Sequence, residues 1–123
     1  MTLAFWAVLA ACLLPLVCAG LAKSGGGFDN AIPRAWLERQ TGWRQRADWA
    51  QRNHYEVFPP FAAAVIIAHI AHAPQAWVNF LAVAFLLIRI GYSAAYVLDR
   101  PSVRSLLWSL GFGCTVGLFA ISA

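Results

Sequence analysis

The stretch LAFWAVLAACLLPLVCAGLA, residues 3–22, decides the fold class, because it contains no charged side chain. Residues 57–73, 76–88 and 105–123 are also uncharged. A helix needs about 20 mostly apolar residues to cross the hydrocarbon core of a bilayer. The composition agrees, since 61% hydrophobic residues present more apolar surface than a soluble domain of this length can bury. The sequence therefore predicts an all-α integral membrane protein.

The first apolar stretch has a second interpretation, as a secretory signal peptide that is removed. Such a peptide begins with basic residues and has an apolar run of about 7–15 residues. Here the basic residues are missing and the run is longer. We expect this segment to be retained as a membrane helix.

Glycine, proline and polar residues punctuate the chain between its apolar stretches. Residues 34–40 are expected to form a short amphipathic segment along the membrane surface, and Thr41-Gly42 to end it. Pro59 and Pro60 are expected to kink or loosen the helix that contains them. We expect a single domain, residues 1–123, folded as a four-helix bundle. Its helices are predicted at about residues 3–22, 46–73, 75–98 and 102–123.

The net charge of +4 is distributed in a way that indicates orientation in a membrane. Eight of the nine basic residues lie in the connection between the first and second apolar stretches or between the third and fourth, namely Lys23, Arg34, Arg39, Arg44, Arg46, Arg52, Arg100 and Arg104. The positive-inside rule makes this face cytoplasmic. In a bacterium the protein would lie in the inner membrane with both termini periplasmic. The charges serve orientation, so no nucleic-acid partner is expected.

Polar side chains cluster toward this predicted cytoplasmic end. Residues three or four positions apart share a helix face. The three sets that do so are Arg52, Asn53 and Glu56; Arg89, Tyr92 and Tyr96; and Arg104, Ser105 and Trp108. Ionisable residues inside a membrane are costly unless they are paired or face water. The three sets predict a cavity for a small anion that also carries an amino group, with arginines on its carboxylates and Glu56 on its ammonium.

Each of these residues also has a structural interpretation. Arg52 could extend to lipid phosphates, and Arg104 could add to the positive side of the membrane. Glu56 and Arg89 could form an ion pair, and Tyr92 and Tyr96 could be packing residues. The convergence of three sets on one end of the bundle favours a binding site.

The chain resembles the MAPEG family, the membrane-associated proteins in eicosanoid and glutathione metabolism, in the patterns Arg52-Asn53-x-x-Glu56-x-x-x-Pro60-Phe61, Arg89-x-x-Tyr92-x-x-x-Tyr96 and Arg104-Ser105. Residues 28–61 are similar to bacterial members in particular. The resemblance implies homotrimers of four-helix subunits that bind glutathione between neighbouring subunits.

Residue roles follow from the same resemblance. Arg52, Asn53 and Glu56 would hold the charged and amide groups of glutathione, whereas Tyr96, Arg104 and Ser105 would come from the adjacent subunit. Arg104 would stabilise the thiolate, which attacks an electrophile dissolved in the lipid. Arg89 and Tyr92 belong to the same predicted binding set. Partners would be membrane lipids, a lipophilic small-molecule substrate and further copies of the chain.

The sequence departs from the family pattern at several positions. Trp49 stands where many members have an arginine, and Trp108 where the prostaglandin-type synthases have a tyrosine. Those synthases also have a histidine in place of Tyr92, and only Lys23 roughly matches their cation near the end of the first helix. These departures argue against specialised eicosanoid synthesis.

The leading hypothesis is therefore a membrane-bound glutathione-dependent transferase or peroxidase acting on lipophilic electrophiles. The alternative is a non-catalytic member that binds a small thiol or anion, or that has only a structural role. A small multidrug transporter would need a deep carboxylate that this chain lacks. Cys12, Cys18 and Cys114 are expected to be small buried residues without redox function. No metal site is expected, although His69 and His72 have i, i+3 spacing.

Overall fold

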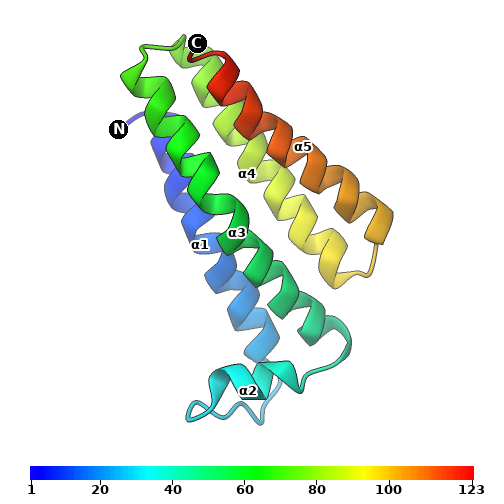
Figure 1. The fold of residues 1–123 in the computed structure, drawn as a ribbon. Helices are drawn as coiled ribbons and strands as arrows, with labels where there is room; N and C mark the ends of the chain where they lie inside the picture. Colours follow the sequence, from blue (N-terminus) through cyan, green and yellow to red (C-terminus); the bar gives the residue numbers. More distant parts are fainter.

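The computed structural model describes every residue from 1 to 123 and contains helices but no strand. Three of its helices, α1, α4 and α5, are long and apolar enough to cross a membrane, which indicates a multi-pass membrane protein. The prediction of an all-α fold is confirmed. The five helices are α1 (Leu3–Lys23), α2 (Pro33–Glu38), α3 (Gly42–Ile70), α4 (Gln75–Val97) and α5 (Pro101–Ala120) (Figure 1).

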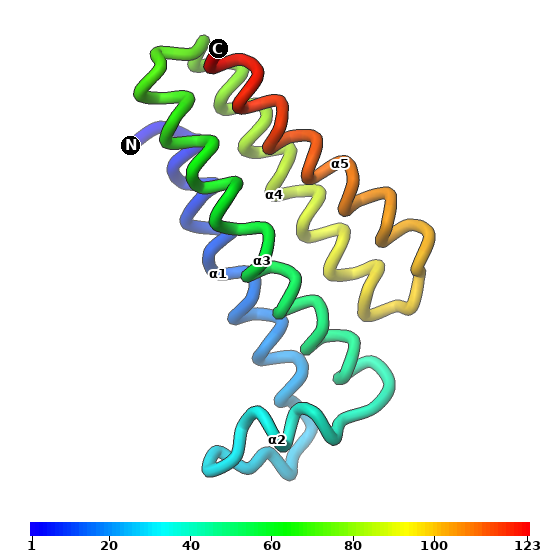
Figure 2. The backbone as a smooth tube through the Cα atoms, in the orientation of Figure 1, coloured from blue at the N-terminus to red at the C-terminus, as the bar shows by residue number.

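The bounds of α3 differ most from the sequence-based prediction. The helix begins at Gly42, four residues before Arg46, because Thr41 is extended and Gly42 adopts a φ of +64° that turns the chain directly into the helix. It ends at Ile70, since His72 takes a left-handed φ of +54°. The other bounds shift by three residues or fewer: α2 occupies 33–38, and α5 ends at Ala120. α3 is one helix from Gly42 to Ile70 with Pro59 and Pro60 inside it, and Figure 2 shows its backbone trace.

The long helices form an elongated bundle with the two chain termini at one end and α2 at the other (Figure 1). α1 packs along α3, and α4 packs along α5 and also contacts α1 and α3. The turn between α4 and α5 lies at the end that carries α2. The basic residues of both connections are therefore gathered at one end of the molecule, opposite the termini.

The buried face of α1 consists entirely of small residues. Spacings of three and four place them on one side of the helix, and they are Ala4, Ala7, Ala11, Pro15, Cys18, Ala19 and Ala22. Small side chains let two backbones approach closely, which is the usual basis of helix contacts in lipid. Ala4, Ala7 and Ala11 share a core cluster with Ala64 and Phe61 of α3. α1 is thus held by close backbone approach rather than by large interlocking side chains.

Large apolar side chains lie mostly on the outside of the bundle. Leu13, Leu16 and Val17 of α1 and Phe80 and Leu87 of α4 are all exposed. A soluble bundle would bury these residues, whereas a lipid-facing surface favours them. The expectation that all three cysteines are buried is wrong for Cys12, which is exposed next to the buried Ala11, while Cys18 and Cys114 are buried.

The small-residue face of α1 generates a stability prediction. Ala11→Leu should lower the free energy of unfolding by about 1–3 kcal/mol, because the added atoms must force α1 away from the core. Cys12→Leu, on the adjacent exposed position, should change it by less than about 0.5 kcal/mol. Unfolding of the purified protein in mixed micelles, followed by circular dichroism, measures both. Equal destabilisation by the two variants would contradict the packing described for α1.

Candidate functional site

A single arginine in the bundle interior organises the polar residues. Arg89 of α4 is only 1% exposed, and its Nη2 donates to Asn53 Oδ1 of α3 at 2.9 Å. Its Nε and Nη2 approach Nδ1 of His54, also on α3, at 3.3 and 3.0 Å. Because a guanidinium has no acceptor, Nδ1 of His54 must be unprotonated and must accept these bonds. Arg89 thereby ties α4 to α3 through two neutral side chains.

The other ring nitrogen of His54 extends the network back to α4. Nε2 lies 2.6 Å from Ser93 Oγ, and Ser93 Oγ itself donates to the Arg89 carbonyl at 3.1 Å. His54 Nε2 therefore carries the ring proton and donates a hydrogen bond to Ser93 Oγ. The Cys18 thiol of α1 approaches the same hydroxyl at 3.7 Å. Polar groups from three helices are joined here inside the bundle.

Sequence analysis missed the role of His54. The residue lies on the buried face of α3, away from the exposed Arg52 and Glu56. A usable signal was present, because Ala47, Ala50, His54 and Phe61 follow one another at spacings of three, four and seven. Histidine on an otherwise apolar stripe requires a buried hydrogen-bond partner, which Arg89 provides.

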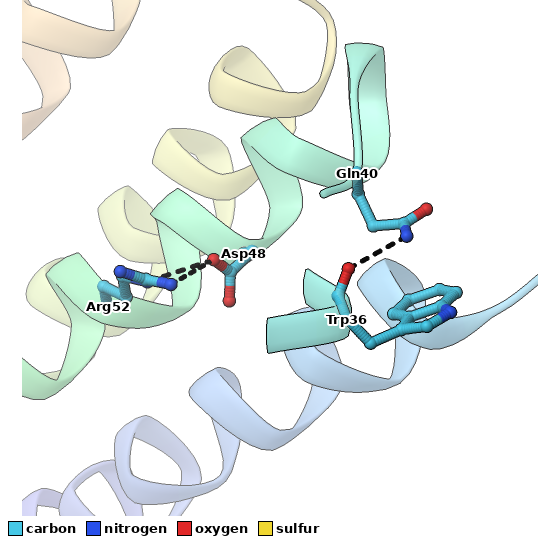
Figure 3. A network of polar contacts seen from close by, with 4 residues as sticks. All are labelled: Trp36, Gln40, Asp48 and Arg52. Carbon is cyan, nitrogen blue, oxygen red and sulfur yellow. Dashed lines mark hydrogen bonds and ion pairs between the residues drawn. The ribbon is translucent and has the colours of Figure 1, made fainter. Parts of the chain in front are cut away.

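Arg52 is engaged by a residue that sequence analysis did not consider. Its Nε and Nη2 donate to Asp48 Oδ2 at 3.0 and 2.9 Å (Figure 3). Asp48 lies one turn before Arg52 in α3. The Asp48 side chain is 6% exposed, whereas that of Arg52 is 53% exposed. Arg52 thus neutralises the buried carboxylate of Asp48, while part of its guanidinium stays exposed.

The end of α2 is closed by a side chain. Gln40 donates to the Trp36 carbonyl, as Figure 3 also shows.

Asn53 links the buried arginine to an exposed carboxylate. While its Oδ1 accepts from Arg89, its Nδ2 donates to Glu56 Oε2 at 3.1 Å. Glu56 itself is exposed and forms no salt bridge. The amide therefore fixes the direction of a carboxylate that has no cationic partner of its own within the chain.

Arginine side chains contact tyrosine rings along the C-terminal half of α4 and the start of α5. The Arg89 Cζ atom lies 3.9 Å from the centre of the Tyr92 ring, and the Arg104 Cζ atom lies 4.5 Å from that of Tyr96. The two tyrosine rings meet edge to face at 5.6 Å. Cation–π contacts of this kind hold a guanidinium in place without neutralising its charge. Arg104 is thus positioned by Tyr96 and remains available to an anion.

All eight predicted site residues line three adjoining hollows. The outer hollow, about 360 Å³, is lined by Trp49, Arg52, Asn53, Glu56, Tyr92 and Tyr96. The α5 hollow, about 300 Å³, is lined by Tyr92, Tyr96, Arg104, Ser105, Trp108 and Ser109. The inner pocket, about 200 Å³, reaches Arg89 and shares Asn53 and Glu56 with the first hollow and Trp108 with the second. The structure therefore brings these side chains together, and their roles toward a ligand stay predictions.

The two histidines considered for a metal site, His69 and His72, have different surroundings. His69 Nδ1 donates to the Val65 carbonyl at 2.7 Å, and Nε2 of the same ring lies 2.9 Å from Thr2 Oγ1. The His69 ring also stacks on Phe5. These contacts hold the start of α1 against the end of α3. His72 lies beyond the helix in the left-handed turn. No three histidine, cysteine, aspartate or glutamate side chains are grouped as metal ligands would be.

Comparison with known proteins gives one clear result. Residues 3–123, essentially the whole chain, match the sequence pattern of the MAPEG family. No curated protein and no solved structure matches the chain significantly.

The buried network generates a second prediction. His54→Ala removes the acceptor of two Arg89 donors and should destabilise the protein by about 2–3 kcal/mol, because a buried charged donor without a partner is costly. His54→Asp keeps an acceptor beside the guanidinium and should restore most of that loss. Thermal unfolding in detergent measures both. Equal losses for the two variants would show that Arg89 does not depend on an acceptor at residue 54.

Proposed function

Because this chain belongs to the MAPEG family, we propose that it is a membrane-bound, glutathione-dependent transferase or peroxidase acting on lipophilic electrophiles. The observation that carries the proposal is the position of Arg104. It lies over Tyr96 in the α5 hollow, which shares both tyrosines with the outer hollow of Arg52, Asn53 and Glu56. A cation for a thiolate and groups for a charged peptide are thus adjacent.

The topology that we propose has four membrane-crossing helices, with α3 as the fourth. The part of α3 from Val57 to Ile70 is uncharged, while its first half carries the charged residues of the site. Four crossings put both termini on the same side of the bacterial inner membrane, and we propose that this side is the periplasm. The end that carries α2 and the basic connections then faces the cytoplasm, in accord with the positive-inside rule and with the cytoplasmic location of glutathione.

Glutathione has two carboxylates, one ammonium group, two amides and a thiol, and each type finds a complement in the hollows. Arg52 would hold a carboxylate with the exposed side of its guanidinium while its other side stays on Asp48. Glu56 would accept the ammonium group, because its carboxylate has no cationic partner in the chain. Ser105 and the tyrosine hydroxyls would bind remaining carbonyl and carboxylate oxygens.

The chemical step then depends on Arg104. A fixed cation beside the thiol favours the thiolate, and the thiol proton passes to water. The thiolate sulfur donates an electron pair to the electrophilic carbon, and a C–S bond forms as the leaving group departs with its own bonding pair. With a hydroperoxide, the thiolate attacks an oxygen and the O–O bond breaks, giving a sulfenic acid and an alkoxide, which takes a proton from water to become the alcohol. A second glutathione converts that acid to the disulfide and water.

Assembly as a homotrimer is part of this proposal. Arg52 and Glu56 are exposed on the protomer, on a helix that continues into the apolar layer. Charged groups at such a position are stabilised by facing another subunit or a water-filled crevice rather than lipid. A neighbouring copy would close the open side of the outer hollow, and it could supply Tyr96, Arg104 and Ser105 across the boundary.

A specific observation favours the second candidate, a member that binds a thiol without turnover. Trp108 lines the α5 hollow beside Arg104, where a tyrosine would offer a hydroxyl to the sulfur. Trp49 lines the outer hollow and offers no charge to a carboxylate. Glutathione binding without conversion of any electrophile would identify this second function.

Removal of Arg104 tests the chemistry. Arg104→Ala should abolish the ultraviolet thiolate absorbance that appears when glutathione is added near pH 7, because the stabilising cation is lost. Arg100→Ala removes an exposed arginine from the same end of the molecule and should leave the absorbance unchanged. The measurement is difference absorbance near 240 nm in detergent, on the order of one thiolate per bound glutathione. Persistence of the signal in Arg104→Ala would remove this residue from the proposed role.

Removal of the Glu56 charge tests the binding mode. Glu56→Gln should weaken glutathione binding about tenfold, since a charge-assisted hydrogen bond to the ammonium group becomes neutral. The variant should bind desamino-glutathione, which lacks that ammonium group, as well as the unaltered protein does. Glu38→Gln on α2 is the control and should change neither affinity. Isothermal titration in detergent gives the values, and an equal loss for both ligands would exclude a contact between Glu56 and the ammonium group.

A further inference from the structure

A fourth hollow lies between α2 and α3 and takes no part in the proposed reaction. Its lining includes Arg34 and Glu38 of α2 and Asp48, Gln51 and Tyr55 of α3. We call it the α2 hollow. Its volume of about 520 Å³ exceeds that of each hollow of the candidate site. Ligand pockets in proteins measure roughly 300–1,000 Å³, so the α2 hollow has room for a ligand of its own.

The walls of the α2 hollow carry charges of both signs, and only two of them are paired. Arg52 borders this hollow as well as the outer hollow, and its ion pair with Asp48 is the only salt bridge of the structure. Arg34 and Glu38, four residues apart on α2, therefore have no ionic partner within the chain. One cation and one anion remain for a ligand that itself carries both signs.

Acceptor oxygens without a donor belong to the α3 side of the hollow. Gln51 Oε1 is buried and has no hydrogen-bond partner. Both bonds from Arg52 go to Asp48 Oδ2, so Asp48 Oδ1 accepts none from it. A buried acceptor without a donor costs about 1–3 kcal/mol. A primary ammonium group has three N–H donors, and these two oxygens together with the Glu38 carboxylate offer an acceptor to each.

The hollow borders an exposed apolar surface of α3. Tyr55 is half exposed in its wall and lies two residues before the uncharged part of the helix, residues 57–70. Tyr55, Pro59, Ile66 and Ile70 share one helix face by their spacing of four, seven and four, and all four are exposed. Tyrosine is typical of the level of lipid headgroups. A polar hollow that continues into an apolar face fits a molecule with a charged head and hydrocarbon chains.

We propose that the α2 hollow binds a phospholipid whose headgroup has a phosphate and a primary ammonium group, as in phosphatidylethanolamine. Arg34 and the Tyr55 hydroxyl donate to the phosphate oxygens. The ammonium group donates to Gln51 Oε1, Asp48 Oδ1 and Glu38. The acyl chains lie along the exposed apolar face of α3 that begins at Tyr55. The lipid thus bridges α2 and α3 by bonds to both helices.

The same acceptors determine which headgroups are excluded. The trimethylammonium group of phosphatidylcholine has no N–H, so the buried Gln51 oxygen would stay without a donor. Proteins bind such quaternary groups with aromatic rings, and Tyr55 is the only aromatic residue that lines the α2 hollow. Phosphatidylglycerol has the phosphate but no cation for Glu38. Selectivity for a primary ammonium group therefore separates this site from general attraction of anionic lipids to a basic surface.

Dioctanoyl forms of the three lipids test the selectivity on the full chain in detergent. Native mass spectrometry measures the fraction of protein that carries lipid at each concentration. The phosphatidylethanolamine should bind saturably and at least about tenfold more tightly than the other two, since charge-assisted hydrogen bonds are gained. Free phosphoethanolamine has the same charged groups without acyl chains. It should bind at least about tenfold more weakly than the lipid, because the apolar contacts are lost.

Two matched pairs of variants locate the lipid. Gln51→Leu removes the unpartnered oxygen, whereas Gln45→Leu makes the same change on α3 outside the hollow. Arg34→Gln removes the proposed phosphate ligand, whereas Arg39→Gln removes an exposed arginine that does not line the hollow. Gln51→Leu and Arg34→Gln should each weaken binding of the phosphatidylethanolamine about tenfold. Both control variants should bind it as the unaltered protein does.

Thermal unfolding separates loss of a ligand contact from damage to the fold. Without lipid, Gln51→Leu should unfold at the same temperature as the unaltered protein or higher, because it removes a buried acceptor that has no partner. Saturating phosphatidylethanolamine should raise the unfolding temperature of the unaltered protein more than that of Gln51→Leu. Arg34 is exposed, so Arg34→Gln leaves the fold intact and tests the site without relying on Gln51→Leu.

Three results would overturn the proposal: no saturable binding of the phosphatidylethanolamine, equal affinity for the phosphatidylcholine, or equal binding by both members of each variant pair. Equal affinity for free phosphoethanolamine would overturn the lipid as occupant and assign the hollow to a soluble ligand. Gln51 and Arg34 do not line the hollows proposed for glutathione, so these results do not depend on the proposed function.

Discussion

The structure depends on how the charge of Arg89 is accommodated inside the bundle. An ionised group far from water is costly unless hydrogen bonds replace its hydration. Here three hydrogen bonds to Asn53 and His54 and the face of Tyr92 provide that replacement. None of these partners carries a charge, so the positive charge is held in place without being cancelled. The same bonds, together with the stacked rings of Phe61 and Phe85, fix the mutual position of α3 and α4.

The candidate site depends on this arrangement through a chain of contacts. Arg89 orients the oxygen of Asn53, and the amide nitrogen of Asn53 then orients Glu56. On the other side, Tyr92 contacts both Arg89 and Tyr96, and Tyr96 carries Arg104. Glu56 and Arg104, which would bind a ligand, are thus positioned through contacts that begin at the buried Arg89. A bound peptide need not touch Arg89 itself. Such positioning reduces the reorganisation that accompanies binding and chemistry.

Sequence analysis predicted the long helices and the clustering of polar side chains at one end, because hydrophobic length and spacing are local properties. It did not find the role of His54 or the pairing of Arg52 with Asp48. Those depend on which face of α3 meets α4, and the polar half of α3 gives competing patterns of spacing. The start of α3 at Gly42 was missed because glycine usually ends helices, whereas here its left-handed φ begins one. Cys12 was misassigned because the small residue next to it, Ala11, faces inward instead.

The outward face of α3 sets the final constraint on how the protein exists in a membrane. Trp49, Arg52 and Glu56 are exposed on its first half, and Ile66 and Ile70 on its second half. The second half suits lipid or another apolar helix. The first half does not suit acyl chains, because an exposed carboxylate there would have to be protonated or hydrated. Contact with a second copy or with the cytoplasmic interface removes this conflict. The surface that needs covering is therefore also the surface that carries the proposed glutathione site, so that assembly and ligand binding would act on the same side chains.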